Sequence, residues 1–150
     1  MKTKELMIGD WVRYKKNYPD KKLGGIIARV LGISNFIMVR TTGEKYDDVN
    51  PDWLEPIPLT SKILEKNGFT YYGESWYIPY DDKNKSESTM VGFYMYCTEI
   101  NITKGNNVCY RKEIPCKYRS CAENRHVYVH ELQHIWRLCE QNDLADNFVI

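Results

Sequence analysis

The sequence predicts an α+β protein of two parts: a small SH3-like β-barrel at residues 1–55, then an antiparallel sheet packed with a C-terminal helix at residues 56–150. Three observations lead to this prediction. Short apolar runs broken by turn residues fill the first part, which is typical of a small all-β unit. A linker at residues 55–60 follows, stiffened by prolines that fix φ and bias the preceding residues to extended forms. Near the end of the chain, apolar residues repeat at helical spacing.

The first part contains four strand-like runs, which lie at residues 11–14, 26–31, 36–40 and, more weakly, near Val49. A long polar connection separates the first two runs, whereas residues 34–35 and 42–43 mark tight turns between the others. This spacing suits a five-stranded barrel. The opening Gly-Asp-Trp-Val at residues 9–12, followed by a loop and an Ile-Ile-Ala-Arg-Val strand, resembles KOW and Tudor-like barrels.

The second part opens with a short helix, which Thr60 can cap and Gly68 can stop in the left-handed conformation. Strand-like runs follow at residues 69–72, 76–79 and 90–97. Residues 100–103 and 108–111 then pair across residues 104–107, because glycine and asparagine tolerate the positive φ of a tight turn. The last helix is expected at residues 127–140, with one apolar stripe packed on the sheet: Tyr128, Leu132, Ile135, Trp136 and Cys139.

Composition and charge favour a globular protein without a strong overall field. The apolar fraction is 43% and the charged fraction 27%, close to globular averages. The net charge of +1 would not draw the whole molecule onto nucleic acid or membrane, so any such binding must be local. No signal peptide or membrane-spanning stretch is recognisable, which predicts a cytoplasmic location. The five cysteines are then expected as free thiols or metal ligands.

Three segments resemble a family of short uncharacterised proteins from gut-bacterial phages and mobile elements. They are the start MKTKELMIGDWV, the centre LEPIPLTSKILEKNGF and the ending VHELQHIWRLC. The resemblance implies an accessory role in a phage or mobile element, and it transfers no catalytic residue. Residues 119–128 look like an insertion relative to that family.

The segment His130-Glu131-Leu132-Gln133-His134 matches the H-E-x-x-H motif of zinc peptidases. Two histidines one helical turn apart can bind zinc, and the glutamate can activate the zinc-bound water. In this hypothesis His130 and His134 are ligands and Glu131 is the general base. A third ligand is also needed, and Glu140 would point roughly 80–120° away from the two histidines on a continuous helix. The alternative is an exposed polar helix face that needs no metal, made of His130, Gln133, His134 and Arg137.

Four residues offer a second zinc hypothesis, that of a structural site: Cys116, Cys121, His126 and His130. Thiolates and imidazoles this close in sequence could complete a tetrahedral site. Their spacing is not that of a standard finger, which separates its Cys pair from its His pair by about a dozen residues. The alternative is that the cysteines are small buried hydrophobes or lie in loops. Both zinc hypotheses compete for His130.

The loop at residues 14–22 interleaves lysines with tyrosines, a combination that can contact phosphates and stack on bases. The residues expected to bind nucleic acid in this way are Lys15, Lys16, Tyr18, Lys21 and Lys22. A lysine-rich surface loop also serves solubility, and Asp20 dilutes its charge. Both interpretations of this loop stay open.

The function expected from the sequence is that of a non-enzymatic accessory binding protein without a cofactor, whose barrel and aromatic-rich sheet bind a protein or a nucleic acid. A zinc-dependent metallopeptidase centred on residues 130–134 and a nucleic-acid-binding barrel are the alternatives. The sequence contains no glycine-rich phosphate loop and no nucleophile elbow, and no membrane partner is expected. A homodimer through an exposed edge strand or aromatic patch is also open.

Overall fold

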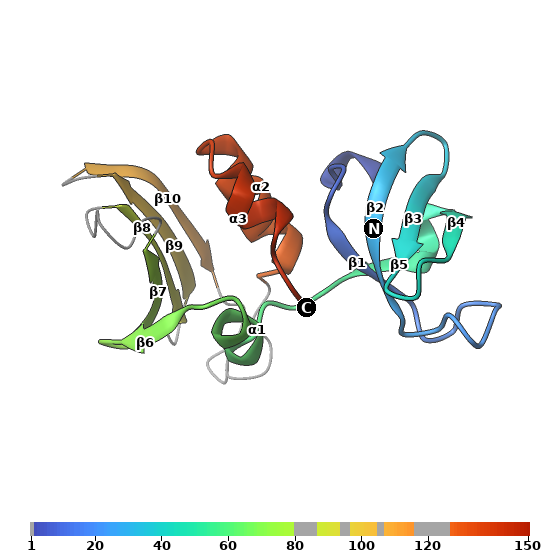
Figure 1. Ribbon diagram of the computed structural model, residues 1–150, viewed down its shortest axis with the longest axis horizontal. Helices are drawn as coiled ribbons and strands as arrows, with labels where there is room; N and C mark the ends of the chain where they lie inside the picture. Colours follow the sequence, from blue (N-terminus) through green and yellow to red (C-terminus); the bar gives the residue numbers. More distant parts are fainter. Residues whose placement is uncertain (1, 80–86, 94–96, 105–106, 116–126) are drawn as a thin grey trace. The chain divides into compact units, whose positions relative to one another are not determined.

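The computed structural model describes residues 2–79, 87–93, 97–104, 107–115 and 127–150 (Figure 1). It has a mixed α+β structure with two five-stranded antiparallel sheets. Two compact units divide the chain. The first unit comprises Met1–Ile57 and Tyr128–His134, and the second comprises Pro58–Val127 and Ile135–Ile150. The chain therefore returns to the first unit at residues 128–134. The division expected from the sequence, at residue 55, assigns these residues to the second part.

The sheet of the first unit follows the short apolar runs of the sequence. Its strands are β1 (Trp11–Tyr14), β2 (Ile27–Ile33), β3 (Ile37–Thr41), β4 (Tyr46–Val49) and β5 (Leu54–Pro56). They lie in the order β4-β3-β2-β1-β5, and each pairing is antiparallel. Among the described residues no pairing joins β4 to β5, so hydrogen bonds do not close this sheet into a barrel. Two short 3-10 helices flank its strands, η1 (Thr3–Glu5) and η2 (Pro51–Trp53).

Alternation of buried and exposed residues along the strands builds the core of the first unit. Buried and exposed residues alternate along the whole of β3. In β1, Val12 and Tyr14 are buried. The Tyr14 hydroxyl donates to Asp47 Oδ2 at 3.2 Å, which pairs the polar atom that this side chain carries into the core. Burial and the Asp47 carboxylate raise the pKa of Tyr14, so its phenol stays protonated.

The second unit begins with the helix α1 (Ser61–Lys66), whose ends agree with the sequence prediction. Thr60 Oγ1 accepts the Ile63 N–H at 3.4 Å as the N-cap, and Gly68 has a φ of 81° after the helix. The second sheet follows in the order β10-β9-β8-β7-β6. Its strands are β6 (Thr70–Tyr72), β7 (Ser75–Pro79), β8 (Glu87–Phe93), β9 (Cys97–Lys104) and β10 (Asn107–Pro115).

Two helices end the chain, α2 (Val129–Leu138) and α3 (Asn142–Asp146). Trp136 on α2 anchors the core of the second unit: its Nε1 donates to Thr89 Oγ1 at 2.8 Å, and its ring contacts Phe69 and Phe148. A buried tryptophan with a paired N–H contributes apolar area without leaving a polar atom unsatisfied. Within the described residues, no helix has the length and apolar content needed to span a bilayer.

The structure confirms some predicted boundaries and corrects others. The strand at residues 11–14 and the β9–β10 hairpin are confirmed, and the turn residues 105–106 lie outside the described residues. Glu55 and Pro56 belong to β5 and not to a linker, because they pair with β1. Of the strand expected at residues 90–97, residues 90–93 belong to β8 and Cys97 begins β9, whereas residues 94–96 lie outside the described residues; α3 was not expected. α2 is two residues shorter at each end than the expected helix, and Glu140 adopts a φ of 62° after it.

Candidate functional site

The H-E-x-x-H motif lies in the half of α2 that belongs to the first unit. The glutamate of the motif accepts a hydrogen bond at the start of the helix: Glu131 Oε2 accepts the backbone N–H of Tyr128 at 3.0 Å. Tyr128 precedes the helix and Glu131 is its third residue, so this contact is one half of a capping box. The carboxylate thus satisfies a backbone donor that the helix itself leaves unpaired.

The glutamine of the motif joins α2 to the start of β1. Gln133 Oε1 accepts the N–H of Trp11 at 3.1 Å, and Gln133 Nε2 donates to the Gly9 carbonyl at 3.2 Å. Because the Gln133 side chain is fully buried, these bonds replace the water that its amide loses on folding. Gly9 has a φ of 91°, a conformation that glycine adopts without strain.

The second histidine of the motif pairs with a buried carboxylate. His134 Nε2 lies 2.7 Å from Asp10 Oδ2, which also accepts the Met7 N–H at 2.7 Å. Asp10 is fully buried, and a buried carboxylate is stable only when it is paired. We call Asp10, Gln133 and His134 the helix clasp. Sequence reasoning missed Asp10 because no local pattern distinguishes it from an ordinary polar residue before a strand.

The first histidine is buried beside the clasp. His130 is 6% exposed, its ring stacks on Tyr128, and its Nδ1 has no hydrogen-bond partner in the part of the chain that the structure describes. Burial lowers the pKa of His130; the Asp10 carboxylate opposes this effect and His134 adds to it. The ring is therefore neutral near neutral pH.

The expectation of an exposed polar helix face is wrong. His130 and Gln133 are buried, and His134 keeps only 21% of its side chain exposed. On the opposite, apolar stripe of the helix, Leu132, Ile135 and Trp136 are buried as well. The reason is tertiary: residues of the first unit pair with the polar side chains of α2, a contact that the helical periodicity does not reveal.

Of the two proposed zinc sites, the described residues include all of the H-E-x-x-H motif but only His130 of the structural site. Within the described ranges, no group of three or more His, Cys, Asp or Glu side chains is arranged to hold a metal ion. The rings of His130 and His134 have centroids 5.5 Å apart, but Asp10 engages His134 Nε2. Glu140 lies beyond the end of α2. Cys116, Cys121 and His126, from the second hypothesis, lie outside the described residues.

The loop between β1 and β2 separates its charges from its aromatic residue. Its exposed lysines are Lys16, Lys21 and Lys22, and Lys15 is half-buried. Tyr18 instead packs against Tyr14 and Trp53, with ring centroids 4.8 and 5.8 Å away. The Tyr18 hydroxyl donates to Asp47 Oδ2 at 3.2 Å, and burial and this carboxylate raise its pKa. The lysines can contribute charge to a binding surface, whereas the tyrosine serves the fold.

A row of basic and aromatic side chains crosses the outward face of the first sheet. From β4 to β1 it consists of Tyr46, Arg40, Arg29 and Trp11, each the register partner of the next. Residues directly opposite one another in an antiparallel pair point to the same face of the sheet. The residues beside them along the strands, such as Val39 and Val12, are core residues, so the row faces away from the core. We call it the arginine–aromatic row.

The two ends of the row differ in exposure. Tyr46 is 61% exposed, and Arg40 beside it is exposed, with no hydrogen-bond or ion-pair partner among the described residues. Trp11 and Arg29 are half-buried. Met38, 45% exposed, lies on the same face of β3 as Arg40. The Tyr46 end is therefore open to a partner.

The Trp11 end of the row is held in place by the helix clasp. The Arg29 guanidinium carbon lies 5.9 Å from the Trp11 ring centroid, a cation–π contact. Arg29 Nε donates to the Gly9 carbonyl at 3.2 Å, and the same carbonyl accepts from Gln133. The motif at residues 130–134 is thus connected to the row twice, through this shared acceptor and through the Trp11 N–H that donates to Gln133.

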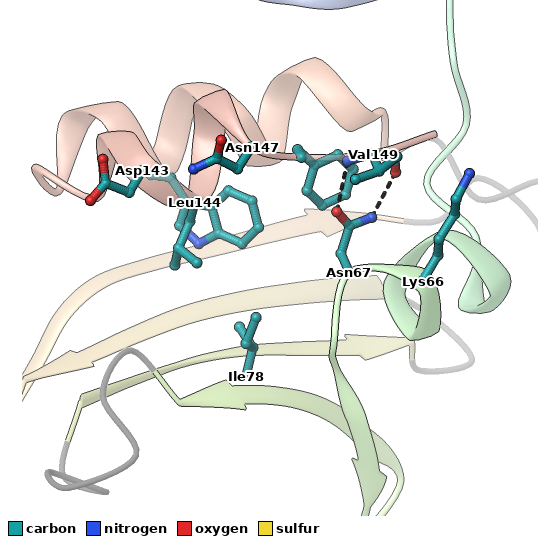
Figure 2. A pocket seen from close by; sticks show the side chains of 9 residues that line it. Lys66, Asn67, Ile78, Asp143, Leu144, Asn147 and Val149 are labelled. Atoms are coloured by element: carbon teal, nitrogen blue, oxygen red, sulfur yellow. Dashed lines mark hydrogen bonds between the residues drawn. The ribbon is translucent and has the colours of Figure 1, made fainter.

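The second unit carries a pocket of about 310 Å³ (Figure 2). Trp136 and Leu144 line its helical side, and Figure 2 shows Ile78 facing this side from β7. Asn67 lies at one end, where its Oδ1 accepts the Val149 N–H and its Nδ2 donates to the Val149 carbonyl, both at 2.7 Å. The chain's own last residues therefore form part of the pocket wall, and the Asn67 amide is used in holding them.

Comparison with known proteins places the chain in no family. It matches no protein-family model, and no curated protein is significantly similar to it. Its function must therefore be inferred from the contacts and exposure of its own residues, in particular the helix clasp and the arginine–aromatic row.

Proposed function

We propose that this chain is a non-enzymatic accessory protein that binds an anionic macromolecule through the arginine–aromatic row, on a first unit of the SH3-like barrel class. The row supports the proposal because it aligns two guanidinium groups and two aromatic rings on one outward sheet face. Guanidinium groups bind phosphates and carboxylates with a fixed fork geometry, and aromatic rings add contact area. From the resemblance of its start, centre and ending, we propose that it serves a phage or mobile element. We also propose that it acts in the cytoplasm.

The charges of the first unit favour an anionic partner. Residues 1–57 and 128–134 together contain ten Lys and Arg against nine Asp and Glu. One of these carboxylates is withdrawn from the surface, since Asp10 is fully buried and pairs with His134. The charge presented to solvent is therefore more positive than the sequence count.

The lysine-bearing loop adds to this charge beside the row. Asp20 in the loop lies 3.7 Å from the ammonium group of Lys45, the residue that precedes Tyr46. This ion pair brings the loop close to the Tyr46 end of the row, and the Lys45 charge offsets the negative charge of Asp20. The exposed lysines of the loop can then contribute to attraction of the same partner at long range.

The contacts of the H-E-x-x-H residues support a structural role for this motif. A zinc peptidase requires a glutamate that can activate water and histidine nitrogens that are open to the metal. Here the Glu131 carboxylate caps α2 and His134 Nε2 pairs with Asp10. The motif is explained by attachment of α2 to β1, and we do not propose peptidase activity.

Retention on immobilised heparin, used as a polyanion, tests the proposal. We expect the protein to be retained at low salt, and the Arg40→Glu variant to elute at a lower salt concentration, because each lost ionic contact reduces the number of displaced counterions. Lys62→Glu is the matched control, since Lys62 is exposed on α1 in the second unit and undergoes the same charge change. A Lys21→Glu variant separates the row from the loop.

Three results would contradict the proposal. The first is a wild-type protein that passes through heparin at low salt. The second is an equal shift in elution for Arg40→Glu and Lys62→Glu, which would mean that only net charge matters. A shift for Lys21→Glu without one for Arg40→Glu would move the binding surface from the row to the loop.

A further inference from the structure

We infer that the partner of the arginine–aromatic row is a single-stranded nucleic acid, with bases stacked on Tyr46 and on the Trp11–Arg29 pair and phosphates bound by Arg40. This inference rests on the proposed function and names its ligand. An acidic protein surface would use the arginines and leave the aligned rings without a specific role. A polymer that repeats an anionic group and a flat ring uses both kinds of side chain.

The length of the row suits a few nucleotides. Its four members stand on four adjacent strands, which are about 4.8 Å apart, so the row extends over about 14 Å. A stacked strand rises about 3.4 Å per nucleotide. The row therefore matches about four stacked nucleotides, or fewer when the strand is extended.

The order of the side chains places a stacking surface at each end and a charge between them. Tyr46 is open, and Arg40 is its register partner on β3, so a base on the ring brings its phosphate toward this guanidinium. At the other end, Arg29 already lies over Trp11 and is fixed by the Gly9 carbonyl. A platform ordered before binding loses less conformational entropy when the ligand arrives.

The shape of the surface favours a single strand over a duplex. Duplexes are read by elements that enter a groove, such as a helix or a two-stranded ribbon. The row instead lies on the outward face of a sheet, and its rings can stack only on bases that are not already stacked in a duplex. Met38 extends the apolar part of the same face, which suits unpaired bases better than a phosphate backbone.

Fluorescence anisotropy with labelled oligothymidylate and oligouridylate tests the inference, with a labelled duplex measured in parallel. We expect salt-dependent binding of the single strands and weaker binding of the duplex. Tyr46→Ala should weaken single-strand binding by about fivefold to a hundredfold, the effect of losing one stacked base. Tyr46→Phe should retain most of the affinity because it keeps the ring. Tyr72→Ala is the control, since Tyr72 is 78% exposed on β6 of the second unit.

The outcomes separate this inference from the proposed function. Retention on heparin without binding of either oligonucleotide overturns the inference and leaves an anionic partner of another class, such as an acidic protein. Duplex binding as tight as single-strand binding, or unchanged affinity in Tyr46→Ala, overturns the stacking arrangement. Loss of affinity in Tyr46→Ala, recovery in Tyr46→Phe and no change in Tyr72→Ala support it. Failure to bind both heparin and oligonucleotides contradicts the two proposals together.

Discussion

His130 carries an imidazole that is almost completely buried and whose pKa burial lowers. Below about pH 6.5, the ordinary value for histidine, the unfolded chain therefore binds a proton more readily than the folded chain. Stability then rises with pH across this window and is lost as the pH falls from about 6.5 through the lowered folded pKa. The buried, unpaired Nδ1 adds to the cost of keeping this ring in the fold.

The His130→Phe variant tests this linkage at one residue. Phenylalanine keeps a ring beside Tyr128 and cannot take up a proton, so we expect the variant to lose less stability than the wild type between about pH 7 and about pH 5. Urea unfolding at several pH values measures the difference in the free energy of unfolding. Parallel pH profiles for the two proteins would show that His130 does not titrate in this way.

The sequence does not reveal the packing of Tyr18. The sequence shows a tyrosine among lysines, which indicates either a base-stacking residue or part of a solubilising surface loop. The structure places its ring against Tyr14 and Trp53 because the loop folds back over the sheet core. Exposure depends on where a loop travels, and a local pattern does not contain that information.

At the scale of the element, the start of α2 depends on the Glu131 cap. Removing the acceptor with Glu131→Ala should lower the free energy of unfolding by about 1 kcal/mol, a typical value for a lost helix cap. Glu131→Gln should lose less, because a glutamine at this position can also accept from the N-cap backbone N–H. Chemical unfolding of the three proteins measures this ranking. Equal stability of Glu131→Ala and the wild type would contradict the capping role.

Strand pairing determines the arginine–aromatic row, and the strands alone do not. The sequence predicts strands at residues 26–31 and 36–40 from short apolar runs, but Arg29 meets Arg40 only in the observed register. That register contains a shift between Val30 and Gly32, where β2 holds one residue more than β3. A different register would pair other residues and separate the two guanidinium groups.

At the scale of the whole molecule, the helix clasp connects residues near the start of the chain with residues near its end. Its hydrogen bonds join positions 122 to 124 residues apart in the sequence. Such contacts are costly to form because they close a long loop, and they determine which segments complete the first unit. The fold of the first unit therefore depends on residues 128–134, which are far in sequence from the strands of that unit.

The Gln133→Leu variant tests this connection. It leaves the Trp11 N–H without its side-chain acceptor, so we expect the free energy of unfolding to fall by about 1–3 kcal/mol, the cost of a buried donor left unpaired. Gln141→Leu is the matched control, because the Gln141 side chain makes no capping hydrogen bond at the start of α3. Denaturant unfolding and hydrogen exchange of the Trp11 amide measure the effect. Equal losses in both variants would contradict a specific role for Gln133.

Local sequence patterns predict three features of this protein: the strand at residues 11–14, the capped helix α1 and the apolar stripe of α2. These follow from φ preferences, capping and side-chain periodicity, which act over a few residues. The roles of the polar residues depend instead on the three-dimensional fold. It buried Gln133 against Gly9 and Trp11, and it aligned two arginines with two aromatic rings. Burial of a polar group and the register of two strands depend on residues far apart in the sequence, so no short pattern encodes them.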